Sequence, residues 1–258
     1  MQKTEYESGT PSWVDLGTTS PDDAAEFYAQ LFGWSVAPPS PGSGGYRMAV
    51  LRQHPVAGIG PLPMPGAPPN WTTYVSVGNA DETTELVRRA GGTVFMEPMD
   101  VFNFGRMAVF ADPFGATFAV WQPGTHIGSG LVNEPGTFVW NELMTTDTDG
   151  SKEFYRAVFG WSAEDQAAPG MNYTTFKVED RPVAGMMLKP DSVPAEVPPC
   201  WGVYFAVDDA DATCSWVVDH GGSVLMGGMD IEWGRIASLM DPQGAWFNVI
   251  AMKEPPPG

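Results

Sequence analysis

The feature that most constrains this chain is an internal repeat. The stretch "EFYAQLFGW" at residues 26–34 returns as "EFYRAVFGW" at residues 153–161, which places the two copies 127 residues apart in a chain of 258. Residues 13–36 and 140–163 agree at 12 of 24 positions without a gap, and the same register continues through "HPVAGIG" and "RPVAGMM". Similarity over such a length indicates two homologous halves that fold alike.

Each half carries a second, fainter periodicity. A short alternating strand, a helix that ends at glycine and three strand-like runs occur in this order and then repeat, which predicts the order βαβββ twice per half. In "WVDLGTT" the alternation places Trp13, Asp15 and Gly17 on one face of a strand, and Val14 and Leu16 on the other. The predicted elements are short, in agreement with a sequence that contains 30 Gly and 25 Pro.

Glycine accounts for the repeated sequence at the ends of the two helices. A helix that must stop and turn into a strand needs a residue with positive φ after its last turn, and Gly33 and Gly160 meet this need at no steric cost. We interpret Trp34 and Trp161, which follow these glycines, as packing residues that cover the last turn. The pairs Gly91–Gly92 and Gly221–Gly222 are expected to stop the other two helices.

Charge limits the partners that the chain can bind. The net charge is −18 with only 13 Lys and Arg, so nucleic acid and anionic membranes would be repelled over most of the surface. The same field would attract a cationic small molecule. No stretch resembles a secretion signal or a membrane span, and we therefore expect a cytoplasmic protein. Cys200 and Cys214 lack the spacing of a zinc site and are expected to be free thiols without an assigned role.

The organisation resembles a known superfamily. Paired βαβββ modules, helices that close on "FYxxxFGW" and a "DPxG" turn before the last strand of each half are similar to the vicinal oxygen chelate superfamily of glyoxalases, bleomycin-resistance proteins and extradiol dioxygenases. The stretches "WVDLGTTSPDDAAEFYAQLFGW", "PVAGIG" and "GRMAVFADPFGATFAVW" resemble its tandem-domain actinobacterial branch, whose members are often labelled hydroxylases or are linked to anthracycline-type antibiotic pathways.

The resemblance implies an α+β fold of four βαβββ modules, arranged as two tandem glyoxalase-like domains with pseudo-twofold symmetry. We assign residues 11–123 to the first domain, 124–135 to a linker and 136–252 to the second domain. Each domain is expected to curl its sheet into an open cup, and we place the cups between the halves. Because both halves lie in one chain, we expect a monomer or a weak homodimer.

The resemblance also raises the question of a metal. Relatives that use a metal place His, Gln or Glu at four positions of each cup. In the first half these correspond to Trp13, Thr72, Ala119 and the stretch 58–60, and in the second half to Trp140, Gly202, Asn248 and the stretch 185–187. Trp, Ala, Gly and Met cannot supply the three or four converging donors that a divalent ion requires. His54, His126 and His220 are expected at the surface. We therefore predict no metal and no cofactor.

Aromatic residues offer the cups another role. Trp13 and Trp140 at the former ligand positions, with Tyr74, Trp121, Tyr204 and Trp246, would form walls that favour a flat, hydrophobic aromatic small molecule, and Asn248 would join them. The alternative is that these rings fill a closed core.

Two carboxylates share the faces of the two tryptophans. Asp15 and Glu142 occupy equivalent places, and partial burial there would raise the pKa of each carboxyl, as suits a general acid or base or an anchor for an amine. The alternative is a structural carboxylate, satisfied by hydrogen bonds and facing Arg106 or Arg235. Asp112 and Asp241 of the "DPxG" turns are expected to begin β-turns and are left out of the site.

Three functions remain open at this stage. The leading hypothesis is metal-independent binding of a planar aromatic, polyketide-like molecule, with or without a cationic amine, in secondary metabolism or antibiotic resistance. The second is a cofactor-free tailoring enzyme of the hydroxylase, lyase or isomerase type, which uses Asp15 or Glu142 as acid or base. The third is a degenerate homologue that retains no ligand.

Overall fold

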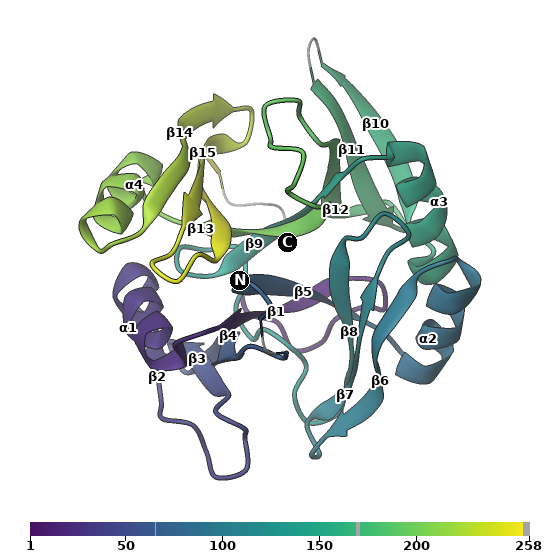
Figure 1. Cartoon of the computed structure of the whole chain (residues 1–258), viewed down its shortest axis with the longest axis horizontal. Coiled ribbons are helices and arrows are strands. Elements are labelled where there is room, and N and C mark those ends of the chain that lie inside the picture. Colours follow the sequence, from purple (N-terminus) through teal and green to yellow (C-terminus); the bar gives the residue numbers. More distant parts are fainter. Residues whose placement is uncertain (65, 169–170, 255–258) are drawn as a thin grey trace.

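The computed structural model describes residues 1–64, 66–168 and 171–254, and it confirms the predicted α+β fold of four βαβββ modules (Figure 1). The elements of the first half are β1 (Pro11–Thr18), α1 (Pro21–Phe32), β2 (Ser35–Val36), β3 (Arg47–Leu51), β4 (His54–Pro61), β5 (Asn70–Ser76), α2 (Ala80–Arg89), β6 (Thr93–Val101), β7 (Gly105–Ala111) and β8 (Thr117–Pro123). The elements of the second half are β9 (Phe138–Thr145), α3 (Thr148–Phe159), β10 (Ser162–Ala168), β11 (Met171–Val178), β12 (Arg181–Leu188), β13 (Cys200–Ala206), α4 (Ala210–Asp219), β14 (Ser223–Ile231), β15 (Gly234–Met240) and β16 (Trp246–Met252).

Each half forms one eight-stranded sheet with the same strand order. The first sheet runs β2-β3-β4-β1-β5-β8-β7-β6, and the second runs β10-β11-β12-β9-β13-β16-β15-β14. The two modules of a half meet at an antiparallel central pair, β1 with β5 and β9 with β13. The register is equivalent in both sheets: Asp15 lies opposite Gly58, and Glu142 lies opposite Gly185.

The helices begin and end as local chemistry requires. Asn79, Asp147 and Asp209 cap α2, α3 and α4 by accepting hydrogen bonds from backbone N–H groups of the first turn. Gly33 and Gly160 follow α1 and α3 in the left-handed region, with φ of 70° and 72°, as predicted. Among the described helices, none has the length and the apolar character needed to cross a membrane.

The two sheets stand back to back with the helices between their edges. Helix α1 packs against α4 on one side of the molecule and α2 against α3 on the other (Figure 1). Near the centre, the hydroxyl of Thr73 on β5 donates a hydrogen bond of 2.8 Å to Asn141 on β9.

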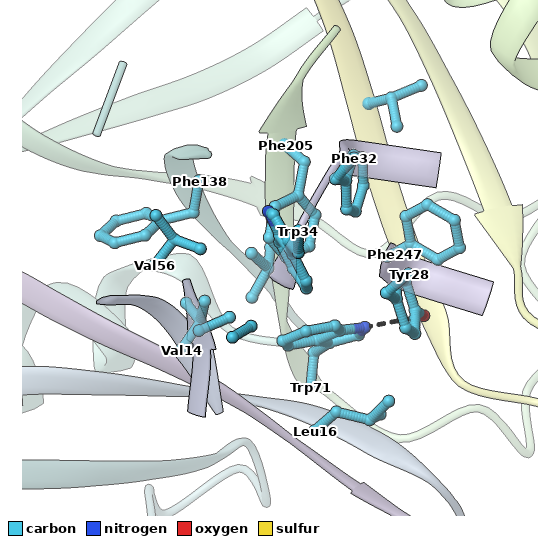
Figure 2. Packing of buried hydrophobic residues seen from close by; sticks show 14 of the residues in the cluster. Val14, Leu16, Tyr28, Phe32, Trp34, Val56, Trp71, Phe138, Phe205 and Phe247 are labelled. Carbon is cyan, nitrogen blue, oxygen red and sulfur yellow. Dashed lines mark hydrogen bonds between the residues drawn. The ribbon is translucent and has the colours of Figure 1, made fainter. Parts of the chain in front are cut away.

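Two hydrophobic cores fill the space between the halves. Val14 and Leu16 of the first sheet share a core with Phe205 and Phe247 of the second, and Trp71 lies among them, as Figure 2 shows. A second core joins the other two modules in the same way. The prediction that the cups lie between the halves is therefore wrong: apolar packing occupies that space, and the faces that carry Trp13 and Trp140 are turned outward.

Trp34 and Trp161 extend this packing, as expected of residues without a site role. Both are buried, and each indole N–H donates to a backbone carbonyl outside its own half, from Trp34 to Gly136 at 2.6 Å and from Trp161 to Gly9 at 2.7 Å.

A duplicated side-chain bridge fastens one half to the other. Tyr28 on α1 donates a hydrogen bond of 3.0 Å to Asp241, and it accepts one of 3.0 Å from the indole of Trp71. Asp241 lies in the "DPxG" turn before β16, where its other carboxylate oxygen accepts from two backbone N–H groups of the turn. The aspartates thus begin turns as predicted, and in addition they receive a tyrosine from the opposite half.

The symmetry-related bridge has the same composition. Tyr155 on α3 donates to Asp112 at 3.0 Å and accepts from Trp201 at 2.9 Å. Both aspartates are buried, and burial raises the pKa of each carboxyl, opposed by hydrogen bonds from the turn backbone and from the tyrosine. In the repeated "FY" pair, the phenylalanine therefore packs in the hydrophobic core. The tyrosine connects its own half to the opposite half.

Replacing Tyr28 by Phe should destabilise the protein by about 1–3 kcal/mol, because a buried carboxylate oxygen of Asp241 and the indole N–H of Trp71 each lose a partner. Tyr155→Phe should cost a similar amount. Urea unfolding measures the loss of stability in both variants. Tyr6→Phe is the control, since its hydroxyl donates a single 2.7 Å bond to the Ser129 carbonyl in a half-buried position. An equal or larger loss of stability in the control would contradict a special role of the two tyrosines in joining the halves.

Candidate functional site

The candidate site lies on the outer face of each sheet, which curls away from the other half. We call the outer face of the first sheet the N-terminal cup and that of the second sheet the C-terminal cup. The N-terminal cup carries Trp13, Asp15, Tyr46, Tyr74, Trp121 and His126, and the C-terminal cup carries Trp140, Glu142, Tyr173, Tyr204, Trp246 and Asn248.

In the N-terminal cup a carboxylate is held by two tyrosines. Tyr74 on β5 donates a hydrogen bond of 2.9 Å to Asp15 on β1, and Tyr46 donates a longer one of 3.3 Å to the same oxygen. The indole of Trp13 donates to the hydroxyl of Tyr46 at 3.0 Å. A continuous polar chain therefore runs from indole to phenol to carboxylate.

The C-terminal cup repeats this arrangement with a longer acid. Tyr204 on β13 donates a hydrogen bond of 2.9 Å to Glu142 on β9, and the hydroxyl of Tyr173 on β11 lies near the same carboxyl and lowers its pKa. The indole of Trp140 donates to the hydroxyl of Tyr173 at 2.9 Å. The sequence placed both tryptophans, both acids, Tyr74 and Tyr204 in the cups, and the structure brings them together.

Tyr46 and Tyr173 were missed, although the sequence contains a signal for them. They occupy the same register in the repeat, and a glycine lies beneath each hydroxyl. A Cβ at Gly58 would stand 1.7 Å from the Tyr46 hydroxyl, and one at Gly185 would stand 1.8 Å from that of Tyr173. The shared glycines of "PVAGIG" and "PVAGMM" therefore make room for the tyrosines.

The cup environment raises the pKa of both acids. Burial raises the pKa of Asp15 to about 6, although hydrogen bonds from Tyr74 and Tyr46 favour the charged form. Burial likewise raises the pKa of Glu142, opposed by Tyr204 and Tyr173. Both side chains nevertheless keep partial exposure at the cup surface.

The anticipated arginines are not the partners of these acids. Arg106 binds Asp81 and Asp100, and Arg235 binds Asp211 and Asp230, all at the periphery of the sheets. Each arginine is thus neutralised near the helix that covers its own module. Tyrosines, which are neutral donors, hold Asp15 and Glu142 instead.

The two cups differ in the rest of their walls. In the N-terminal cup Trp121 is buried against Trp13, and its indole donates to the His126 carbonyl at 2.8 Å. In the C-terminal cup Trp246 is partly exposed and its indole donates at 2.7 Å to Ser238, whose hydroxyl donates to Asn248. Ser238 was not anticipated, because no signal in the sequence ties it to the site.

The expectation of a surface position for His126 is wrong. Its ring stands edge-on to Trp13, with ring centroids 4.7 Å apart and an interplanar angle of 90°, and burial lowers its pKa to about 4. The histidine comes from the segment that joins the halves, which folds back over the first sheet. A sequence cannot show that a connecting segment returns to a particular wall.

The donors in the cups do not fit the metal that the fold family implies. Trp13, Trp140, Gly202 and Ala119 have no donor atom for a divalent ion at the expected positions, and the Oδ1 of Asn248 already accepts from Ser238. Among residues 1–64, 66–168 and 171–254, no three His, Cys, Asp or Glu side chains gather closely enough to hold one. Burial raises the pKa of Cys200 to about 11 and also raises that of Cys214, so neither thiol is activated.

Two shallow hollows lie outside the cups. One of about 280 Å³ is lined by α1 and the neighbouring Arg47, and another of about 490 Å³ lies between α1 and α4 beside Trp216. Neither contains a member of the two carboxylate clusters. Both are open surface depressions; the first lies within the first half, and the second lies where the two halves meet.

Fold and sequence together define the class of protein. Residues 13–121 match the family described as "Glyoxalase-like domain", and residues 137–249 match the "Glyoxalase/Bleomycin resistance protein/Dioxygenase superfamily". The chain belongs to this superfamily as a tandem of two glyoxalase-like domains.

Its relatives resemble it over nearly their whole length. CFP32 of Mycobacterium tuberculosis is 46% identical over 257 residues, covering 96% of this chain and 97% of the relative. The anthracycline biosynthesis protein DauV of Streptomyces sp. (strain C5) is 40% identical over 266 residues, covering 97% of this chain and 96% of the relative. The anthracycline biosynthesis protein DnrV of Streptomyces peucetius is also 40% identical.

Solved structures share the fold at low identity. The Mn(II)-bound glyoxalase from Novosphingobium aromaticivorans matches with a TM-score of 0.65 and 15% identity, over 96% of this chain and 83% of that chain. The 2,3-dioxygenase LapB from Pseudomonas sp. KL28 matches with a TM-score of 0.65 and 12% identity, over 98% of this chain and 96% of that chain.

The raised pKa of Asp15 predicts a pH-dependent cost in stability. Below the unfolded pKa the acid is protonated in both states, and its contribution to stability is lost as pH rises through the folded value of about 6. Asp15→Asn should therefore gain stability relative to the natural protein by roughly 1–3 kcal/mol between pH 4.5 and 7.5. Urea unfolding at both pH values measures this gain, with Asp191→Asn at an exposed position as the control. A pH-independent difference would show that Asp15 carries no such shift.

Proposed function

We propose that this chain acts in secondary metabolism by binding a planar aromatic small molecule in a cup, without a metal ion. The observation that carries the proposal is the duplicated chain of Trp indole, Tyr hydroxyl and carboxylate on the outer sheet faces. In each cup, aromatic rings and one acidic group stand where metal-using relatives have metal ligands.

The physical chemistry of the wall favours a flat ligand. Trp140, Tyr204 and Trp246 present partly exposed rings on one face. Stacking adds about 0.5–1.5 kcal/mol per aromatic pair beyond the burial of area, so two or three rings support binding in roughly the micromolar range.

The acids favour a ligand that carries an amine or a hydroxyl group. Glu142 accepts from Tyr204 at 2.9 Å and retains lone pairs for another donor. The net charge of −18 attracts a cation toward the protein. A polyketide-like quinone with an amine substituent combines these properties.

The relatives support the same biological setting. DauV and DnrV are anthracycline biosynthesis proteins by name, and this chain matches both over nearly its full length. Sequestration of such a product, or its delivery to a tailoring enzyme, is the task that we assign to this chain.

The raised pKa values support a second candidate, a cofactor-free tailoring enzyme. A carboxyl group whose pKa is raised toward neutrality can accept or return a proton near physiological pH. In this case Asp15 or Glu142 would move a proton on the bound aromatic molecule, and the tyrosines would orient the carboxyl. The two candidates differ in whether a product forms.

Titration with mitoxantrone, an anthraquinone with amine side chains, should quench tryptophan fluorescence with a Kd in roughly the micromolar range. Trp140→Leu should weaken binding about 3- to 10-fold, because a stacking ring is lost. Trp216→Leu on α4 is the control, since Trp216 stacks on His220 at the helix side of the sheet. Unquenched natural protein, or equal losses in both variants, would contradict the proposal.

Mass spectrometry of the same mixture separates a carrier from an enzyme. Unchanged mitoxantrone supports the carrier. If a product forms, Glu142→Gln should lower the rate by about 10²-fold or more, because the amide cannot carry the proton. Turnover that survives in Glu142→Gln would remove Glu142 from the mechanism, and Asp15→Asn then tests the other acid.

A further inference from the structure

We infer that the two cups have diverged: the C-terminal cup alone binds the ligand, one molecule per chain, and Asn248 recognises an acceptor oxygen on it, such as a quinone or ketone carbonyl. The inference rests on the proposed function and adds to it the place, the stoichiometry and a polar group of the ligand.

The aromatic wall of the N-terminal cup is covered by the chain itself. Trp13 is 4% exposed, and Tyr74 and Trp121 are each 6% exposed. The His126 ring lies edge-on against Trp13 and 5.8 Å from Trp121 between centroids. A flat ligand therefore finds no free face on these three rings, although Asp15 and Tyr46 keep partial exposure.

The covering segment is fixed at both of its ends. The backbone N–H groups of Gly124 and His126 both donate to the Phe104 carbonyl, at 2.8 and 3.0 Å. Beyond the histidine, Ser129 donates to the Ser12 carbonyl on β1 at 2.8 Å. These bonds hold His126 over Trp13 as part of the fold.

The C-terminal cup offers the ring surface that the N-terminal cup lacks. Trp140, Tyr204 and Trp246 are all partly exposed. Strand β16 differs from β8 at the decisive positions: Ile250 stands where the first half has Trp121, and Trp246 stands where it has Thr117. The aromatic wall is thereby rebuilt on the second half without the residue that anchors His126.

Asn248 carries an unused hydrogen-bond donor in this cup. The side chain is 2% exposed, and within the described part of the chain its Nδ2 has no hydrogen-bond partner. A buried N–H group without a partner destabilises the protein, so an acceptor supplied by a ligand would be favoured. The equivalent position of the N-terminal cup is Ala119, which has no polar group.

The neighbouring bonds fix which end of the amide is free. The Ser238 hydroxyl accepts from the Trp246 indole, so its own hydrogen must be donated elsewhere. The Oδ1 of Asn248 accepts that hydrogen. If the amide were flipped, the Ser238 hydroxyl would face two donors, and its own hydrogen would have no acceptor among the residues that the structure describes. The donor Nδ2 is therefore the free end.

The free donor and the free acceptor lie near each other. Gly202 stands opposite Glu142 across the central strand pair, and a Cβ at Gly202 would lie 3.0 Å from the Nδ2 of Asn248. No side chain of β13 separates Asn248 from Glu142, but the Trp246 ring covers Gly202, with Cη2 2.6 Å and Cζ3 3.1 Å from the same Cβ position. A ligand therefore reaches Nδ2 by displacing this partly exposed ring. A planar molecule with a carbonyl on one edge and an amine or hydroxyl on another can satisfy both, with Trp140 and Trp246 beside it.

Equilibrium dialysis of the natural protein against mitoxantrone tests the stoichiometry. We expect one molecule bound per chain. Two equivalent molecules per chain would overturn the inference while supporting the proposed function. No binding at all would overturn the proposed function and the inference with it. This measurement needs no variant and stays decisive even if substitutions unfold the protein.

Asn248→Leu tests the acceptor, because it removes the donor at nearly constant volume. Mitoxantrone, which has quinone carbonyls, should bind about 3- to 10-fold more weakly, as expected for one lost hydrogen bond. Binding of 9-(aminomethyl)anthracene, which is planar and cationic without a carbonyl, should not weaken. Asn103→Leu, at an exposed hairpin position of the first half, is the matched control. Equal losses for both probes, or no loss for mitoxantrone, would overturn the role of Asn248.

Discussion

The architecture depends on two buried hydrogen bonds between halves, from Tyr28 to Asp241 and from Tyr155 to Asp112. A buried carboxylate is costly unless it is fully hydrogen-bonded, and each aspartate obtains its donors from its own turn and from a tyrosine of the opposite half. The turn that starts the last strand of one half is therefore satisfied only when the helix of the other half docks. This requirement fixes the halves back to back and turns the faces with Trp13 and Trp140 outward.

On the outward faces, glycines allow tyrosine side chains to pack closely against the sheet. Glycine on the strand beside each acid lets a tyrosine hydroxyl approach, and the tyrosine links the indole to the carboxylate. Burial raises the pKa of each acid, and the neutral tyrosine donors oppose this rise only in part. Because each cup is built by one half alone, the second half can change its wall without disturbing the bridges, as the Trp246–Ser238–Asn248 network illustrates.

Much of the fold could be predicted because its signals are local. The repeat indicated two similar halves, alternation in "WVDLGTT" separated the buried Val14 and Leu16 from Trp13 and Asp15, and glycines located the ends of the helices. The same alternation placed the two acids beside the two tryptophans. The position of the cups was predicted wrongly, because periodicity shows that a strand has two faces and does not show which of them meets the partner sheet.

By itself, the sequence determined the modules, their order and the residues that share each strand face, since backbone geometry and hydrophobic alternation act over a few residues. Only the tertiary structure decided that Tyr46 and Tyr173 hold the acids, that Arg106 and Arg235 bind peripheral aspartates, and that His126 covers Trp13. Most of these contacts join different elements of the fold. Their geometry depends on how strands pair and how a connecting segment folds back, and no short stretch of sequence encodes that.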